Sequence, residues 1–360
     1  MIESYLTTGL CGTCYRDLEA EIQFRSDGAA YIVKHCPVHG YEEAMVEKSW
    51  RFWKSAHDEK DERLRSIYNE ITCIESTDRC NVQCAHCYHD PDNSIPDISA
   101  DLLVKKAISI PTRNVALMGA EPTMRNDLPE VISRIKETPF KGEGDREVSI
   151  YSNGINLENI ELVQSLEQAG LDGCSISVHS PKYHKEAIWN KVSRGIDNMV
   201  STDIELGHVS FTVSNVDDMR YAVDKMLWFR DNNKLPLDFC IRSSADIGRS
   251  PSAEEVFVSQ LYDMLTQVCL EKRLKVCRDK DFGSNPYHIH YTVDSFKLVL
   301  IHWPSVKSIS TQYVTHGPWA SFIPNTWGNF TIQIILREGW KKGWWQGQRL
   351  FDDISIKAVD

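Results

Sequence analysis

Three thiols stand close together in the segment Cys80-Asn-Val-Gln-Cys84-Ala-His-Cys87. An iron-sulfur cube is ordinarily held by four cysteine thiolates, so three ligands from one short loop would leave one iron without a protein ligand. An open iron can bind a substrate, as the open position of a catalytic zinc site does. A partial zinc site is the alternative that the three cysteines by themselves leave open. The spacing favours a cluster with one reactive iron.

A second group of metal-binding residue types lies near the N-terminus, where Cys11-Gly-Thr-Cys14 precedes His35-Cys36-Pro-Val-His39. Two ligand pairs about twenty residues apart are typical of zinc ribbons, in which two turns hold one tetrahedral ion. We predict that the ligands are Cys11, Cys14, Cys36 and His39, with His35 as the substitute for His39. Iron in a rubredoxin-like site fits the same spacing, and unmetallated thiols are the remaining alternative. So short a segment buries little apolar surface, so we expect the metal to be structural.

The composition limits the class of protein. The chain has 360 residues, 42% of them apolar, and a formal net charge of -11, which argues against broad binding to nucleic acid or an anionic membrane. No stretch approaches the roughly 20 apolar residues of a membrane span. The beginning, MIESYLTTGLCGTC, has no basic segment leading into an apolar run, so we expect no secretory signal. A cytoplasmic location follows, where clustered cysteines indicate metal binding or catalysis rather than disulfides.

The elements expected around the first metal group are small. Ser26-Asp27-Gly28 is a turn signal between EIQF and AAYIV, two short runs that predict a hairpin. We assign residues 1–45 to this metal knuckle. From Glu42 to Asn69 the chain is charged and lacks glycine and proline, which favours one or two exposed helices. We assign residues 46–68 to a helical linker.

The three-cysteine loop follows a predicted strand. Apolar residues alternate from Asn69 to Thr77, which puts the loop just past the C-terminal end of that strand. Barrels of alternating strands and helices build their active sites at that edge. The next predicted strand, Asn114 to Gly119, leads into the turn Gly-Ala-Glu-Pro.

The C-x3-C-x2-C loop followed by this turn resembles the radical S-adenosylmethionine (SAM) superfamily. In that superfamily the loop holds a [4Fe-4S] cluster whose open iron chelates the amino and carboxylate groups of SAM. The segment that matches Gly119 to Pro122 contacts the amino group. Ala120 stands where a second glycine is usual, and its methyl group slightly crowds the approach to the cofactor.

The resemblance extends along an expected barrel. Strands are predicted at Glu147 to Tyr151, Gly173 to Val178, His208 to Val213 and Leu237 to Arg242, with helical patterns between them such as Val216 to Asp231. Six strands alternating with helices over residues 69–250 predict an α/β fold, a partial (β/α)6 TIM-type barrel. A small metal-binding ribbon precedes it and an α+β extension, residues 251–360, follows.

Polar residues end several of these strands. The resemblance implies that side chains there lie against the ribose and methionyl parts of SAM, although such residues also cap helices. Arg242 and Arg249 could pair with a carboxylate of cofactor or substrate, or form surface ion pairs. The residues expected to contact the cofactor are Gly119, Ala120, Glu121, Pro122, Ser152, Asn153, Ser177 and Arg242.

The reaction implied by the resemblance begins when the reduced cluster passes an electron to SAM. The carbon-sulfur bond breaks, and a 5'-deoxyadenosyl radical abstracts hydrogen from an unactivated carbon of the substrate. The protein must hold that carbon near the radical and exclude water. A flavodoxin-type or ferredoxin-type electron donor is implied as a partner.

The C-terminal extension should decide the substrate. After a helix near Ala253 to Lys275, two alternating runs joined at Val293-Asp294-Ser295 predict a hairpin that covers the barrel. His288 and His290 should share one face of a strand, as a metal pair, a substrate acid or ordinary strand histidines. Six tryptophans of this region are expected either to line a substrate pocket or to pack the extension itself: Trp303, Trp319, Trp327, Trp340, Trp344 and Trp345.

The class of substrate is suggested by what the extension lacks. Cys269 and Cys277 are too few for the additional clusters of peptide-maturing members, and no segment resembles a cobalamin domain. A metal knuckle before such a barrel resembles enzymes related to the molybdenum-cofactor cyclase and to pterin- and lipid-modifying relatives. We therefore favour a small biosynthetic molecule as substrate. The alternatives are a peptide or carrier-bound substrate and a non-enzymatic zinc-binding adaptor.

Overall fold

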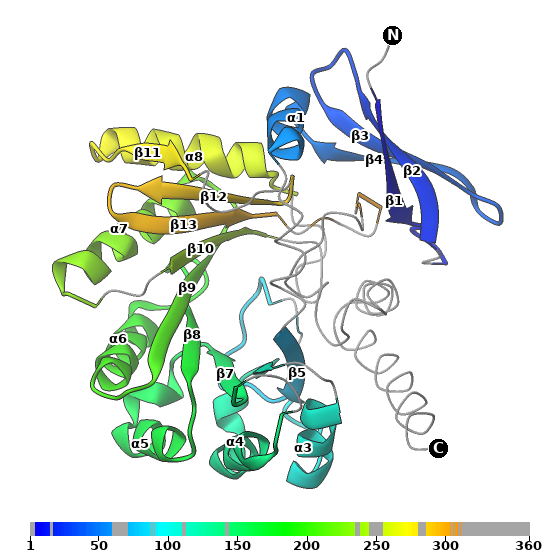
Figure 1. Ribbon diagram of the computed structural model, residues 1–360. Helices are drawn as coiled ribbons and strands as arrows, with labels where there is room; N and C mark the ends of the chain where they lie inside the picture. Colours follow the sequence, from blue (N-terminus) through cyan, green and yellow to red (C-terminus); the bar gives the residue numbers. More distant parts are fainter. Residues whose placement is uncertain are drawn as a thin grey trace.

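The structure is a computed structural model with two β-sheets (Figure 1). It describes residues 4–14, 17–59, 71–87, 89, 91–109, 113–140, 144–234, 238–244, 255–279, 286–302, 304, 307, 308 and 310. Arg249 and the six C-terminal tryptophans lie outside the described residues, so the predictions made for them stay predictions. None of the helices in the described ranges has the length and apolar character of a membrane span.

The N-terminal sheet is antiparallel, with the strands in sequence order. Its strands are β1 (Ser4–Leu10), β2 (Asp17–Phe24), β3 (Ala30–Cys36) and β4 (Gly40–Glu47). The hairpin expected around Gly28 is confirmed, because β2 and β3 pair from Phe24 and Ala30 onward. The alternation of β2 and β3 buries Ile22 and Ile32 completely on the same face of the sheet.

The expected linker contains a strand and a packed helix instead of exposed helices only. β4 runs to Glu47, and α1 (Trp50–Asp58) begins at Ser49, whose Oγ accepts a hydrogen bond from the Phe52 N–H. Trp53 is 1% exposed and lies edge-on to Phe24, with ring centroids 5.7 Å apart. β4 contains three glutamates, of which Glu47 is buried, and their charge hides the strand pattern in the sequence. Residues 60–70 are not described.

The larger sheet carries the expected barrel. Its six predicted strands are β5 (Ile71–Thr77), β6 (Asn114–Gly119), β7 (Glu147–Ser152), β8 (Gly173–Ser177), β9 (Glu205–Val213) and β10 (Asp238–Ser243). Each pairs in parallel with the next. In the described residues β5 forms one edge of the sheet, so the barrel is open. The predicted partial TIM-type barrel is confirmed.

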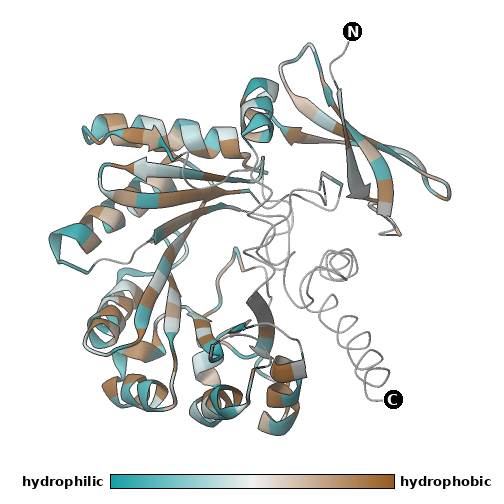
Figure 2. Cartoon of the chain, viewed as in Figure 1, coloured by the Kyte–Doolittle hydropathy of each residue, from teal (hydrophilic) through white to brown (hydrophobic). Residues whose placement is uncertain are grey.

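Helices connect these strands and cover the outer face of the sheet (Figure 1). They are α3 (Ala100–Ser109), α4 (Leu128–Glu137), α5 (Ile160–Gln168), α6 (Glu186–Val200) and α7 (Val216–Asp231). Figure 2 shows mainly hydrophobic residues along the strands and mixed colours around the helices. Val115, Ala116 and Leu117 of β6 are all buried, as expected for a parallel strand covered on both faces.

The C-terminal hairpin extends the barrel sheet, whereas we expected it to cover the barrel. It consists of β12 (His288–Val293) and β13 (Phe296–Ile301), with β11 (Val276–Arg278) beyond it and α8 (Val258–Glu271) before it. β13 pairs in parallel with β10, so Leu300 lies opposite Ile241. The edge of β10 offers unpaired backbone groups, and the apolar run FKLVLI suits a buried parallel position.

The two sheets are joined through buried contacts. Glu47, at the end of β4, accepts hydrogen bonds from both the backbone N–H (3.1 Å) and the hydroxyl group of Ser259 in α8. Tyr287, which precedes β12, packs into the apolar core of the N-terminal sheet. The metal knuckle is therefore braced against the C-terminal part of the barrel domain.

Candidate active site and metal centre

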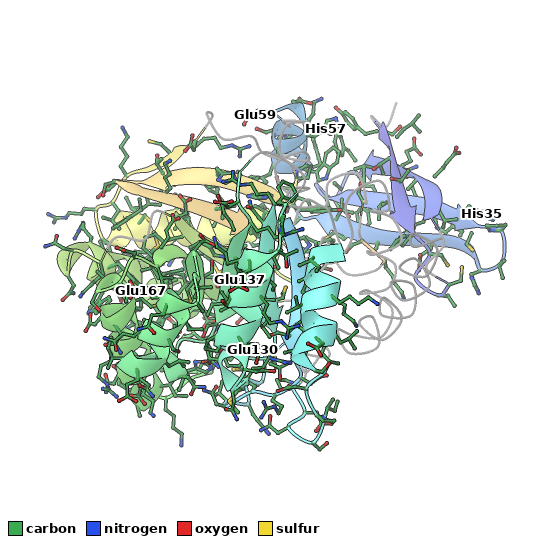
Figure 3. All side chains as sticks on the ribbon, turned by 60° about the horizontal axis from the view of Figure 1, so that its bottom comes forward. His35, His57, Glu59, Glu130, Glu137 and Glu167 are labelled. Atoms are coloured by element: carbon green, nitrogen blue, oxygen red, sulfur yellow. The ribbon has the colours of Figure 1, made fainter. Side chains whose placement is uncertain are left out.

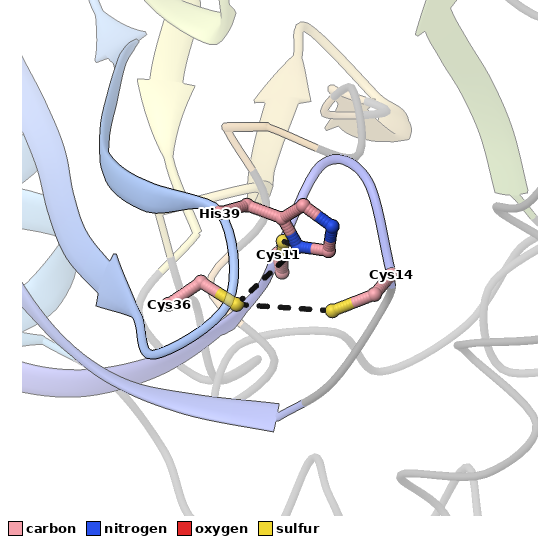
Figure 4. Close-up of side chains that lie close together, drawn as sticks. All are labelled: Cys11, Cys14, Cys36 and His39. Carbon is pink, nitrogen blue, oxygen red and sulfur yellow. Dashed lines mark hydrogen bonds between the residues drawn. The ribbon is translucent and has the colours of Figure 1, made fainter.

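The four predicted N-terminal ligands form one compact group (Figure 4). Their ligand atoms lie within 4.8 Å of one another. Cys14 Sγ is 3.8 Å from Cys36 Sγ, and His39 Nδ1 lies 3.4 Å from Cys11 Sγ and 3.5 Å from Cys36 Sγ. A tetrahedral zinc ion with ordinary bond lengths needs sulfur-sulfur edges of about 3.8 Å and sulfur-nitrogen edges of about 3.5 Å. The group therefore fits one tetrahedral ion.

Two turns of the small sheet present these ligands. Cys11 follows β1 and Cys36 ends β3, and each lies a few residues before its partner in the turn. Backbone N–H groups of Val38 and His39 lower the pKa of the Cys36 thiol, which favours the thiolate that metals bind. His35 is exposed at the rim of the sheet (Figure 3) and is not part of the group, so His39 is the better candidate ligand.

A pocket at the C-terminal edge of the barrel brings most of the other predicted residues together. The predicted residues in its lining are Cys80, Cys84, Cys87, Gly119, Ala120, Ser152, Asn153, Ser177 and Arg242. They come from the ends of five different strands, as the active sites of such barrels do. Glu121 and Pro122 do not line the pocket.

The three thiols of the loop do not converge on one point. Among the described residues, the N-terminal four are the only group of three or more His, Cys, Asp or Glu whose ligand atoms all lie within 4.8 Å of one another. Two sulfurs bound to a single zinc ion are at most about 4.6 Å apart. At least one pair among Cys80, Cys84 and Cys87 is therefore too widely spaced for one ion. This spacing disfavours a single zinc ion and leaves room for a cluster of several metal ions.

Cys80 is held through both its backbone and its thiol. The Asn93 side chain accepts from the Cys80 N–H (2.9 Å) and donates to its carbonyl oxygen (3.1 Å). Asn153 Nδ2 lies 3.7 Å from the sulfur. Burial raises the pKa of the Cys80 thiol to about 11, so this thiol needs a metal to displace its proton. Asn93 was missed in the sequence because only the folded loop returns it to Cys80.

Gly119 brings the turn after β6 against the cysteine loop. Its φ is +118°, and a Cβ at this position would lie 2.6 Å from the Thr77 carbonyl oxygen. The Ala120 N–H donates to that same oxygen (3.0 Å), and the Glu121 N–H donates to the carbonyl oxygen of Arg79 (3.0 Å). The backbone after β6 is thus tied to the start of the loop, and only glycine suits position 119.

Glu121 lies behind the pocket wall and braces it. Its side chain is fully buried, and burial raises the pKa of its carboxyl group. Oε1 accepts from Ser152 Oγ (2.8 Å) and Thr123, and Oε2 accepts from the Asn153 N–H (2.7 Å). Its position makes Glu121 a support for Ser152 and Asn153, while Pro122 begins the buried turn that follows.

Arg242 of β10 lines the pocket and contacts one residue of its own strand and one of the neighbouring β9. Its Nη2 is 3.2 Å from His208 Nε2, and its Nε is 3.4 Å from Cys240 Sγ. Burial lowers the pKa of His208 to about 3, so the ring is neutral and can accept from the guanidinium. The guanidinium of Arg242 keeps its positive charge and can attract an anionic part of a ligand.

Three histidines beside the cysteine loop were missed as a group. His86 Nε2 lies 3.0 Å from His179 Nδ1, and His184 Nε2 lies 2.8 Å from Cys84 Sγ. His179 and His184 belong to the segment after β8, about 100 residues from the loop. The one local signal was His86, which stands inside the cysteine motif.

A fourth missed histidine lies between two carboxylates. His89 lines the pocket, with Nδ1 3.1 Å from Glu75 Oε1 and Nε2 3.2 Å from Asp78 Oδ1. Burial raises the pKa of Glu75 to about 7. Burial opposes the charged form of His89, but Glu75 and Asp78 outweigh it and raise the pKa of His89 to about 9. The pair Glu75 and His89 anchors the far end of the loop to β5.

His288 and His290 share one face of β12, as predicted, with ring centroids 4.6 Å apart. Neither belongs to a group of three metal-ligand residues in the described part of the chain. A metal role for this pair therefore gains no support.

The fold and the site define a class of protein: an open (β/α) barrel with a three-thiol pocket at its catalytic edge and a separate metal knuckle. Comparison with known families agrees. Residues 74–219 match the Radical SAM superfamily, and residues 4–48 match the HMPTM N-terminal zinc ribbon domain. The chain therefore contains a radical SAM domain, which is an enzyme domain, and an N-terminal zinc ribbon.

Individual relatives cover part of the chain. A probable GTP 3',8-cyclase of Sulfolobus acidocaldarius is 39% identical over 147 residues, which are 37% of this chain and 45% of that protein. One from Methanococcus maripaludis is 29% identical over 181 residues, 48% of this chain and 55% of that protein. The chain thus spans about half the length of these relatives. The solved structure of Streptococcus suis SuiB bound to precursor peptide SuiA is 13% identical, with a TM-score of 0.43 over 58% of this chain and 49% of that one.

Proposed function

We propose that this protein is a radical SAM enzyme that acts on a small biosynthetic molecule. When bound at the pocket, a [4Fe-4S] cluster and SAM together supply a 5'-deoxyadenosyl radical that takes a hydrogen atom from the substrate. The observation that carries the proposal is the joint lining of one pocket by Cys80, Cys84 and Cys87 and by the backbone turn at Gly119 and Ala120.

In this proposal the chain's own residues have distinct roles. Cys80, Cys84 and Cys87 hold the cluster, because thiolates are its usual protein ligands. Gly119 lets the backbone turn that it forms with Ala120 approach the amino group of SAM.

The strand ends surround the rest of the cofactor. Asn153 and Ser177 present polar groups from β7 and β8, and Arg242 offers a guanidinium to a carboxylate or phosphate. Glu121 supports Asn153 from behind. Together these groups orient the ligands near one another, which is the protein's main contribution when a cofactor carries the difficult step.

The substrate proposed first is a nucleotide-like small molecule. The support is the similarity to proteins named probable GTP 3',8-cyclase. A flavodoxin or ferredoxin is proposed as the electron donor. The N-terminal group is proposed to hold one structural zinc ion, with Cys11, Cys14, Cys36 and His39 as ligands.

The test is an anaerobic turnover assay. The protein is reconstituted with iron and sulfide, reduced with dithionite, and given SAM with and without GTP, while 5'-deoxyadenosine is followed by mass spectrometry. We expect product from the wild type and none from Cys84→Ala. Cys269→Ala, which removes a buried thiol of α8 outside the pocket, should retain product formation.

Two results would contradict the proposal. Zinc alone at Cys80, Cys84 and Cys87, with no cluster after reconstitution, would favour a zinc-binding adaptor. Equal 5'-deoxyadenosine from wild type and Cys84→Ala would show that the pocket is not the site. Stimulation of product by GTP would support the nucleotide class, and stimulation only by a peptide or carrier-bound compound would replace it.

A further inference from the structure

Cys84 has a histidine partner that the proposed chemistry does not use. Its Sγ lies 2.8 Å from Nε2 of His184, although the two residues are 100 positions apart in the sequence. His184 is 5% exposed, and Cys84 is partly buried. The contact is therefore made in a protected place, where a hydrogen bond has more effect than it has in water.

The fold holds the His184 ring in place. The backbone N–H of His184 donates to the carbonyl oxygen of Ser180 (2.9 Å), which closes a turn after β8. Ser180 Oγ in turn donates to Asp218 Oδ1 in α7 (2.6 Å). On the other side the ring lies edge-on to His179, with centroids 4.8 Å apart at 87°. These contacts aim Nε2 at the sulfur.

The direction of the hydrogen bond follows from the chemistry of a metal-bound sulfur. A thiolate that ligates iron has no proton, so it can only accept. The contact with Cys84 then requires the proton of the His184 ring to be on Nε2. Such N–H groups beside cluster sulfurs are one of the features that set the reduction potential of iron-sulfur clusters.

We propose that His184 hydrogen-bonds the Cys84 thiolate and raises the reduction potential of the cluster, so that the electron donor reduces it more easily. The inference rests on the proposed function, since it needs a cluster at Cys84. One electron enters from the donor and no bond is made or broken. The added electron makes the thiolate more negative, and the N–H therefore stabilises the reduced state more than the oxidised state. His184 acts through Cys84 and is a positioning residue.

The experiment is an anaerobic redox titration of the reconstituted full-length protein, followed by the EPR signal of the reduced cluster. Three variants are compared with the wild type at equal iron content. His184→Leu removes the donor, and His184→Gln keeps an N–H near the position of Nε2. Tyr183→Phe is the control, because it changes the same segment by removing a hydroxyl that contacts Ser214 (3.2 Å).

The expected result separates the donor from the shape of the side chain. His184→Leu should lower the equilibrium constant for one-electron reduction about tenfold, which corresponds to about 59 mV. His184→Gln should recover most of that difference, and Tyr183→Phe should titrate like the wild type. Equal potentials for wild type and His184→Leu would overturn the proposal, as would a potential for His184→Gln as low as that of His184→Leu.

A second measurement covers the case in which His184→Leu does not take up iron. Wild type and His184→Gln are both labelled with 15N-histidine, and pulsed EPR of the reduced cluster is recorded. We expect a weak 15N coupling in the wild type that is lost in His184→Gln. No such difference, or a strong coupling typical of a nitrogen bound to iron, would overturn the proposal. A wild type without any cluster would overturn both this inference and the proposed function, whereas a loaded cluster with equal potentials would overturn this inference alone.

Discussion

The backbone N–H of Asn153 donates a 2.7 Å hydrogen bond to Oε2 of Glu121, which joins the turn after β7 to the turn after β6. The other oxygen of Glu121 accepts from Ser152 Oγ. One buried carboxylate therefore sets the distance between two segments that meet at the pocket. The Asn153 side chain also contacts the cysteine loop, where its Nδ2 donates to Asn81 Oδ1 (2.8 Å).

Glu121→Gln should weaken both folding and cofactor binding. The glutamine amide would place an NH2 group against one of the N–H or O–H donors that the carboxylate now satisfies, so a buried donor loses its partner. We expect a loss of roughly 1–3 kcal/mol in the free energy of unfolding, and weaker SAM binding by calorimetry. Glu130→Gln, which alters an exposed ion pair of α4 with Arg134, is the control and should change both by little. Wild-type stability and affinity in Glu121→Gln would contradict the bracing role.

Gly119→Ala should disrupt the pocket more than a comparable glycine substitution elsewhere. The positive φ of Gly119 alone is expected to cost roughly 1–3 kcal/mol for a residue with a Cβ. The added Cβ would also lie 2.6 Å from the Thr77 carbonyl oxygen and push the turn from the cysteine loop.

Gly28→Ala is the matched control for this prediction. Gly28 has a φ of +92° and no heavy atom within 4 Å of an added Cβ, so only the conformational cost of about 1–2 kcal/mol applies. In Gly119→Ala, both the free energy of unfolding in urea and the formation of 5'-deoxyadenosine should fall. In Gly28→Ala, only the free energy of unfolding should fall. Full product formation by Gly119→Ala would show that the close approach is not needed.

Removal of zinc should unfold the N-terminal sheet. We expect about one zinc ion per chain, with His39→Ala losing most of it and His35→Ala retaining it, because only His39 lies within reach of the three thiols. Zinc content is measured by mass spectrometry. Hydrogen exchange of β1 to β4 should rise in His39→Ala and in chelator-treated wild type. Equal zinc content in the two histidine variants would refute the ligand assignment.

The contact between Glu47 and Ser259 predicts a pH-dependent stability. Burial raises the pKa of Glu47, against the opposing effect of its hydrogen bonds to Ser259 and of nearby His302. The native state therefore binds this proton more tightly than the unfolded chain, and its contribution to stability falls as the pH rises from the unfolded pKa through the folded one.

Glu47→Gln isolates this contribution, because its amide stays neutral at every pH. The free energy of unfolding of Glu47→Gln should increase relative to that of wild type as the pH rises from about 5 to about 8, because only the wild type loses stability there. Urea unfolding at several pH values measures the difference. Ser259→Ala should be less stable than wild type throughout, since it leaves a buried oxygen with one donor fewer. A difference that shrinks with rising pH would show that Glu47 is buried in its charged form.

Much of the fold followed from local patterns. The alternation of EVSIY and GCSIS predicts β7 and β8, and the apolar period from Val216 to Asp231 predicts α7 with both ends correct. β4 was missed because its three glutamates, one of them buried, disguise the strand pattern. The place of β13 was also missed, since strand order depends on which edge is open and not on the pattern of the strand itself.

The sequence by itself determined the chemical types and the short spacings: three thiols in one loop, two ligand pairs in another, and glycine before Ala120. These are local properties, because neighbours in the chain stay neighbours in every conformation. The tertiary structure alone decided that Glu121 supports Asn153 instead of facing the pocket, and that His39 is nearer the thiols than His35. It also brought His184 to Cys84, 100 residues away. Contacts of this kind depend on how strands and helices pack, which no short segment of the chain encodes.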